Sequence, residues 1–157
     1  MASVETWLMA SGPPLARLID AQREPICQTV ALRLEQAFPT LCYSQQRPDA
    51  ATFQHSAFVR SPERLHTTLQ VALRFRTLAV IDREYRWFWN LGPRFGVAPE
   101  HFLSMHRWYF EAVRQFVVQS PNDRAGLDAF EDTLLQMANH IASLPPLAQR
   151  ADQRKFA

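Results

Sequence analysis

Apolar residues recur at helical spacing along much of the chain, and the most regular run follows Pro99. Five positions there alternate spacings of four and three, which places them on one face of a helix: Phe102, His106, Tyr109, Val113 and Phe116. Pro99 suits a first helical turn, and Glu100 lies near the positive end of the helix dipole. The pattern predicts a helix that begins near Pro99 and turns this face, with His106 in it, toward a core.

Other segments have the same period. Ser3 is a candidate cap for a short helix, and a second short piece follows Pro13-Pro14. A better-defined helix is predicted from Pro25 to just before Pro39, with Ile26, Val30 and Leu34 on its apolar face. A last helix follows the loop and cap at 120–123, and its predicted apolar positions are Leu127, Phe130, Leu134, Met137 or Ala138, and Ile141.

The strongest sequence signal for the start of a helix lies in the middle of the chain. Residues 44–60 are polar, contain a proline and keep no period, so they are predicted to form a loop with at most a short helical turn. Ser61-Pro62-Glu63 combines a cap, a first-turn proline and an acid at the positive dipole end. A long, centrally buried helix is predicted from there to about Ile81, followed by an aromatic-rich segment at 82–90.

Composition agrees with a helical, globular chain. The 157 residues are 47% apolar and 20% charged, and only four are glycine. We predict one all-α domain over residues 1–157, with a core at about 13–145 and a frayed tail at 146–157.

Several function classes are disfavoured. A net charge of +2 is too small to argue for nucleic-acid binding, and the arginines among the aromatics at 82–90 are better explained by core packing with cation–π support. Cys27 and Cys42 form neither a CxxC site nor a disulfide framework. No leader pattern is present and no window reaches the roughly 18 apolar residues of a membrane span. The expected location is the cytoplasm, without membrane contact.

The run Phe95-Gly96-Val97-Ala98-Pro99-Glu100-His101-Phe102 resembles the corner between the F and G helices of bacterial globins. The resemblance implies a globin-like three-over-three sandwich of six to eight helices, with a homodimer formed through the last two long helices, from Pro99 and from Arg124. In globins the histidine that ligates haem iron stands four residues before the glycine of this phrase. Gly92 occupies that position here.

The same resemblance implies a pocket between helices. Its predicted lining residues are His66, Leu69, Phe88, Val97, Leu103 and His106. If haem is bound, iron needs an unusual axial ligand, for which His66, His106, Met105 and Tyr85 are the candidates. The alternative interpretation is that each histidine lies in the core with its hydrogen bonds satisfied.

No P-loop, GxSxG, GxGxxG or HExxH motif occurs, so no catalytic residue is assigned. Two hypotheses follow. The first is a non-enzymatic, globin-like sensor or ligand-binding protein without conventional haem, whose pocket takes a small apolar ligand. The second is a haem globin that binds oxygen or nitric oxide through His106 or His66.

Overall fold

The computed structural model describes residues 3–39, 50–92 and 97–145. Six α-helices and no strand occupy these residues: α1 (Val4–Ala21), α2 (Arg23–Ala37), α3 (Ala50–Phe75), α4 (Ala79–Leu91), α5 (Pro99–Phe116) and α6 (Pro121–Ala142). The all-α class is therefore confirmed. Among these helices none is both long and apolar enough to cross a membrane. The predictions for Cys42, residues 95–96 and the tail at 146–157 lie outside the described residues.

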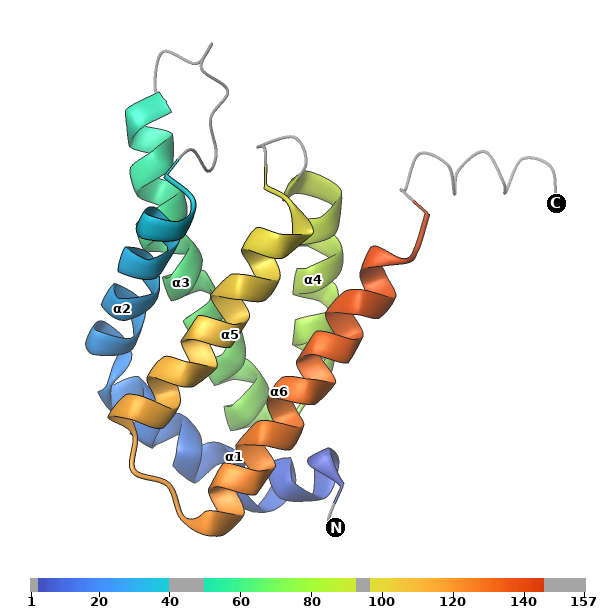
Figure 1. The fold of residues 1–157 in the computed structure, drawn as a ribbon. Helices are drawn as coiled ribbons and strands as arrows, with labels where there is room; N and C mark the ends of the chain where they lie inside the picture. The colour runs from blue at the N-terminus through green and yellow to red at the C-terminus, as the bar shows by residue number, and fades with distance from the viewer. Residues whose placement is uncertain (1–2, 40–49, 93–96, 146–157) are drawn as a thin grey trace, which may run out of the picture.

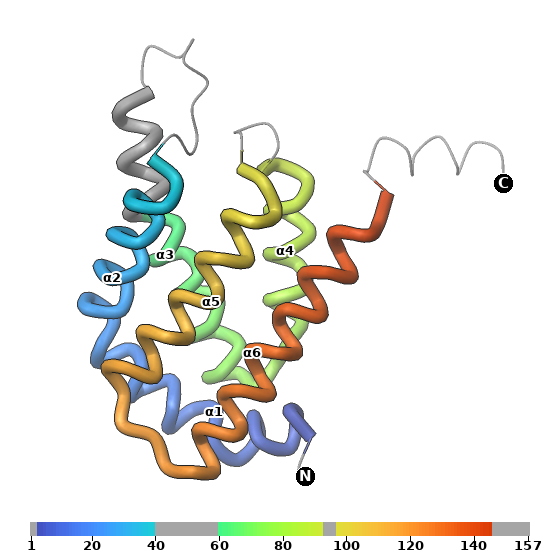
Figure 2. The backbone as a smooth tube through the Cα atoms, viewed as in Figure 1, coloured from blue at the N-terminus to red at the C-terminus, as the bar shows by residue number. Residues whose placement is uncertain are grey.

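The helices form two layers (Figure 1). Helices α2, α5 and α6 make the front layer, α3 and α4 lie behind it, and α1 crosses at the lower end. Helix α2 packs on α3 and α5, α1 packs on α3 and α6, and α4 packs on α3 and α6. The tube in Figure 2 reverses direction between α3 and α4, and again on either side of α5. This path sets α3 and α4 antiparallel to each other close to α5.

Side chains from the helices meet in one apolar core. The predicted face of α5 is buried at Phe102, His106, Tyr109 and Val113, and Phe116 is half-buried. The predicted faces of α2 and α6 are also buried, at Ile26, Cys27, Val30, Leu34, Leu127, Phe130, Leu134, Ala138 and Ile141. Each large apolar side chain buried in this way contributes about 1.5 to 3 kcal/mol. The 3.6-residue period thus located the core of three helices correctly.

Helix α1 is continuous, where the sequence predicted two pieces divided at Pro13 and Pro14. Ser3 caps it as predicted, since its Oγ accepts a hydrogen bond from a backbone N–H one turn later (3.2 Å). Pro13 has no N–H to donate to the carbonyl of Met9, four residues earlier. Arg76 Nε donates to that carbonyl instead, at 3.1 Å. The predicted break was wrong because a side chain distant in sequence supplies the missing donor.

Helix α3 begins at Ala50, so the predicted start at Ser61 was wrong. Pro62 lies inside the helix and is buried. A proline there removes one helical hydrogen bond, but α3 packs on α1 and α2, and such tertiary contacts commonly override a local signal. The turn before Pro62 therefore stays helical.

The predicted continuation of this helix to Ile81 was also wrong. Arg76 has a φ of 54°, in the left-handed region, and the chain turns between α3 and α4 at this residue. Thr77 Oγ1 then accepts a hydrogen bond from the Ala79 N–H at 3.2 Å, at the first residue of α4. No glycine or proline marks this turn, so no local pattern indicated it.

Candidate functional site

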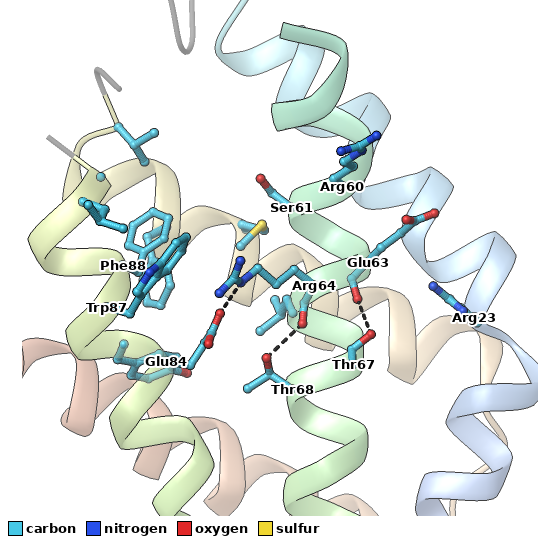
Figure 3. Close-up of a pocket in the computed structure, with 17 residues that line it drawn as sticks. Arg23, Arg60, Ser61, Glu63, Arg64, Thr67, Thr68, Glu84, Trp87 and Phe88 are labelled. Carbon is cyan, nitrogen blue, oxygen red and sulfur yellow. Dashed lines mark hydrogen bonds and ion pairs between the residues drawn. The ribbon is translucent and has the colours of Figure 1, made fainter. Parts of the chain in front are cut away.

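A cavity of about 710 Å³ lies between α3 and α4 and reaches α5 (Figure 3). Small-molecule sites in proteins typically span about 300 to 1,000 Å³. Most of its polar side chains come from α3, whereas α4 and α5 supply mainly apolar ones. The lining residues are Arg23, Arg60, Ser61, Glu63, Arg64, Leu65, Thr67, Thr68, Glu84, Tyr85, Trp87, Phe88, Leu91, Gly92, Val97, Phe102 and Met105. The site thus has one polar wall and one apolar wall.

The cavity contains part of the predicted pocket. Phe88 and Val97 line it, and so does Gly92, which forms the C-cap of α4. Four other predicted lining residues, His66, Leu69, Leu103 and His106, are not among its lining residues and pack in or against the hydrophobic core. Two of the six predicted lining residues, Phe88 and Val97, therefore belong to this cavity, and whether it holds a ligand stays a prediction.

His66 holds three helices together from inside the core. Its Nε2 donates to Asp20 Oδ1 at 2.9 Å, because a carboxylate can only accept. Its Nδ1 must then accept from the Tyr109 hydroxyl at 2.8 Å. Burial lowers the pKa of His66, while the hydrogen bond from His66 lowers the pKa of Asp20. A neutral imidazole and an ionised carboxylate therefore link α1, α3 and α5.

His106, a residue of α5, also has both ring nitrogens hydrogen-bonded inside the core. Its Nδ1 donates to the carbonyl of Phe102 at 2.9 Å, so its Nε2 accepts from the Tyr85 hydroxyl at 2.7 Å. Burial lowers the pKa of His106 to about 4 and raises that of Tyr85. The pair stays neutral and joins α4 to α5.

We expect Tyr85→Phe to lower the free energy of unfolding by about 1 to 2 kcal/mol, because it leaves the buried Nε2 of His106 without a donor. Urea denaturation at neutral pH measures the effect. His140→Gln, at an exposed position of α6, is the control and should leave stability unchanged. Equal stability of Tyr85→Phe and the unmodified chain would contradict the assigned hydrogen bond.

The chain from Asp20 through His66 to Tyr109 has the carboxylate, imidazole and hydroxyl order of a nucleophilic triad. Its hydroxyl is not placed for that chemistry. The Tyr109 side chain is only 1% exposed and is not among the residues that line the cavity. A substrate in the cavity would not meet this hydroxyl, so the arrangement serves to join helices.

The residues around the cavity do not fit an iron–histidine bond to haem. Gly92 offers no ligand, and both ring nitrogens of His66 and of His106 are already hydrogen-bonded inside the protein. Among the described lining residues, only Tyr85 and Met105 belong to the types that ligate haem iron, and the Tyr85 hydroxyl is donated to His106. Over the described ranges, no group of three or more His, Cys, Asp or Glu side chains is arranged to hold a metal ion.

The sequence did not point to the polar wall. Arg64 of α3 is ion-paired with Glu84 of α4, and its guanidinium carbon lies 3.8 Å from the centre of the Trp87 ring. Ser61, Arg64 and Thr68 follow one another at helical spacing, which is a detectable signal for a shared face of α3. Their partners on α4 could not be identified, because the pairing depends on how the two helices pack.

Comparisons of the chain with models of known protein families, with curated proteins and with solved structures find no match.

Proposed function

We propose that this chain is a globin-like, non-enzymatic protein that binds a small, mainly apolar molecule between α3 and α4, without an iron–histidine bond. The observation that carries the proposal is the cavity of about 710 Å³ between these helices. Its apolar wall includes Phe88, Leu91, Phe102 and Met105. Burial of a ligand's apolar surface against such a wall supplies binding free energy of about 25 cal/mol per Å².

The helix arrangement supports the globin-like part of the proposal. Six helices in two layers are compatible with the architecture that the motif at 95–102 implies, in which α4 would correspond to the haem-binding helix and α5 to the helix after it. The end of α4 is then the place where a proximal histidine is expected, and the chain has Gly92 there. The two buried histidines have structural hydrogen bonds instead, which favours an organic ligand over haem.

A sensing role belongs to the same proposal. The cavity lies between two helices whose side chains meet across it, at the Arg64–Glu84 ion pair. A ligand that binds one arrangement of α3 and α4 more tightly than another shifts the population toward it. The bound and free states would then present different surfaces to a partner.

Calorimetric titration with decanol, a neutral chain molecule, tests the proposal. We expect one molecule to bind per chain, and Val97→Trp to abolish binding because the indole enters the cavity that Val97 lines. Val118→Trp is the matched control, since Val118 is 92% exposed and does not line the cavity. Absence of binding to the unmodified chain, or equal binding by both tryptophan variants, would contradict the proposal.

Haemin titration separates the proposal from the haem-globin alternative. Protein purified from cells supplied with a haem precursor should be colourless, and added haemin should give no stoichiometric Soret band. A Soret band that is lost in His106→Ala or His66→Ala would instead establish one of these histidines as an axial ligand and refute the non-haem assignment.

A further inference from the structure

The polar wall of the cavity is organised around Arg64, which extends from α3 toward Glu84 and Trp87 of α4 (Figure 3). Its Nε donates to the Glu84 carboxylate, and its guanidinium lies over the Trp87 ring. These two contacts restrict the orientation of the guanidinium before any ligand arrives. Restricting the orientation in advance lowers the entropy cost of further hydrogen bonds.

The terminal nitrogens of this guanidinium remain available. Within the described part of the chain, Nε is the only nitrogen of Arg64 that has a hydrogen-bond partner, so both terminal NH₂ groups have donors to spare. The Arg64 side chain is 53% exposed, so a ligand can reach it from solvent. These donors form a fork that matches the two oxygens of a carboxylate.

One neighbour on α3 adds to this group. Ser61 lies one helical turn before Arg64 and points toward the same side of α3, and its hydroxyl has no hydrogen bond to another described residue. Arg60 also lines the cavity, but Figure 3 shows it, with Glu63 and Arg23, on the other side of α3, toward α2. The polar group that faces α4 therefore consists of Arg64, its partner Glu84 and Ser61, and its unpartnered donors are the terminal nitrogens of Arg64 and the Ser61 hydroxyl.

We propose that the cavity binds an amphiphilic carboxylic acid, whose carboxylate is held by Arg64 and Ser61 while its apolar body lies against Phe88, Phe102 and Met105. This inference rests on the proposed ligand-binding function and specifies the chemical class of the ligand. A carboxylate on an arginine forms charge-assisted hydrogen bonds, which are about twice as strong as neutral ones. The apolar wall contributes affinity, and Arg64 selects the acid.

The test compares three probes with the same alkyl chain, decanoate, decanol and decyltrimethylammonium, by calorimetric titration below their micelle-forming concentrations. We expect decanoate to bind about tenfold or more tightly than decanol, and the ammonium probe to bind more weakly than both. Arg64→Gln should remove most of the preference for decanoate, and Ser61→Ala should reduce it. Arg107→Gln, at an exposed arginine of α5 that does not line the cavity, is the matched control and should leave the preference unchanged.

Glu84→Gln tests the charge preference of the cavity independently. It removes a negative charge beside the proposed carboxylate, so decanoate binding should stay the same or become tighter. If the ammonium probe binds best and Glu84→Gln weakens it, the wall selects cations over the Trp87 ring and the inference is overturned. Equal affinity for decanoate and decanol would also overturn it, while leaving the proposed function intact. If none of the three probes binds, both the inference and the proposed function are contradicted.

Discussion

Lowering the pH from 6.5 to about 4 is expected to remove on the order of 3 kcal/mol of folding stability through His106 alone. Burial lowers the pKa of His106 from 6.5 to about 4, because a charged imidazole inside the core loses its hydration. Its Nδ1 proton is donated to a backbone carbonyl and its Nε2 accepts the Tyr85 hydroxyl. Protonation at Nε2 would end this acceptance, because the nitrogen would then be a donor and the Tyr85 hydroxyl oxygen would have to accept.

The direction of this pH dependence follows from whether the folded or the unfolded chain binds a proton at the higher pH. Above pH 6.5 His106 is neutral in both the folded and the unfolded chain, so its contribution is fully present. Below 6.5 the unfolded chain binds a proton that the folded chain does not, and stability falls until the pH reaches about 4. Burial also lowers the pKa of His66, so its effect has the same direction.

Urea denaturation curves at a series of pH values through this interval measure the effect. His106→Gln removes the titrating group while keeping a side chain that can accept from Tyr85, and its stability should depend less steeply on pH. His140→Gln removes an exposed histidine and should keep the full dependence. If His106→Gln and the unmodified chain lose stability equally, the buried neutral histidine is not the cause.

Local signals predicted the parts of the fold that depend on neighbouring residues. The predicted cap at Ser3 accepts a hydrogen bond from a backbone N–H three residues later, and the period after Pro99 indicated the buried face of α5. Ser120, in the segment predicted as loop and cap, caps α6, which begins at Pro121, three residues before the predicted start at Arg124. The failures at Pro13, Pro62 and Arg76 have a common origin. At each of them the outcome depended on contacts between separate helices or on a turn without glycine or proline.

The candidate site shows the same difference between local signals and contacts that join separate helices. Phe88 and Val97 could be named because Phe88 shortly precedes the motif that suggested a pocket and Val97 lies within it. The partner of His66 on α1, Asp20, lies 46 residues away in the chain, and Glu84 lies 20 residues from Arg64. Such pairs depend on the rotation and separation of whole helices, and a helical period does not encode either quantity.

Gly12→Ala is expected to destabilise the fold by about 2 to 3 kcal/mol, although alanine favours a helix by about 1 kcal/mol over glycine. A Cβ at this position would lie 2.5 Å from the carbonyl oxygen of Leu73 and 3.4 Å from its carbonyl carbon. These are backbone atoms of α3, so no side-chain rotation relieves the overlap. The two helices must move apart instead, which opens the packing around buried neighbours such as Leu8 and Leu15.

The displacement should also reach the links between α1 and α3. Asp20 on α1 accepts from His66 at 2.9 Å, and Arg76 donates to the carbonyl of Met9 at 3.1 Å. Both bonds require α1 to stay close to α3, so Gly12→Ala should weaken them together. Thermal and urea denaturation give the stability change, and the ¹⁵N shifts of the His66 ring report whether Nε2 still carries its proton next to Asp20.

Arg17→Ala, at an exposed position of the same helix, is the control for helix propensity and should be neutral or slightly stabilising. Gly12→Ala behaving like Arg17→Ala would mean that α1 and α3 can separate without loss, and would contradict the close contact at Leu73. A loss of stability with unchanged His66 ring shifts would confine the strain to the crossing point. The expected result is a loss of stability together with a change in the His66 ring shifts. It would show that Gly12 determines how closely α1 approaches α3, the helix that carries the polar wall of the cavity.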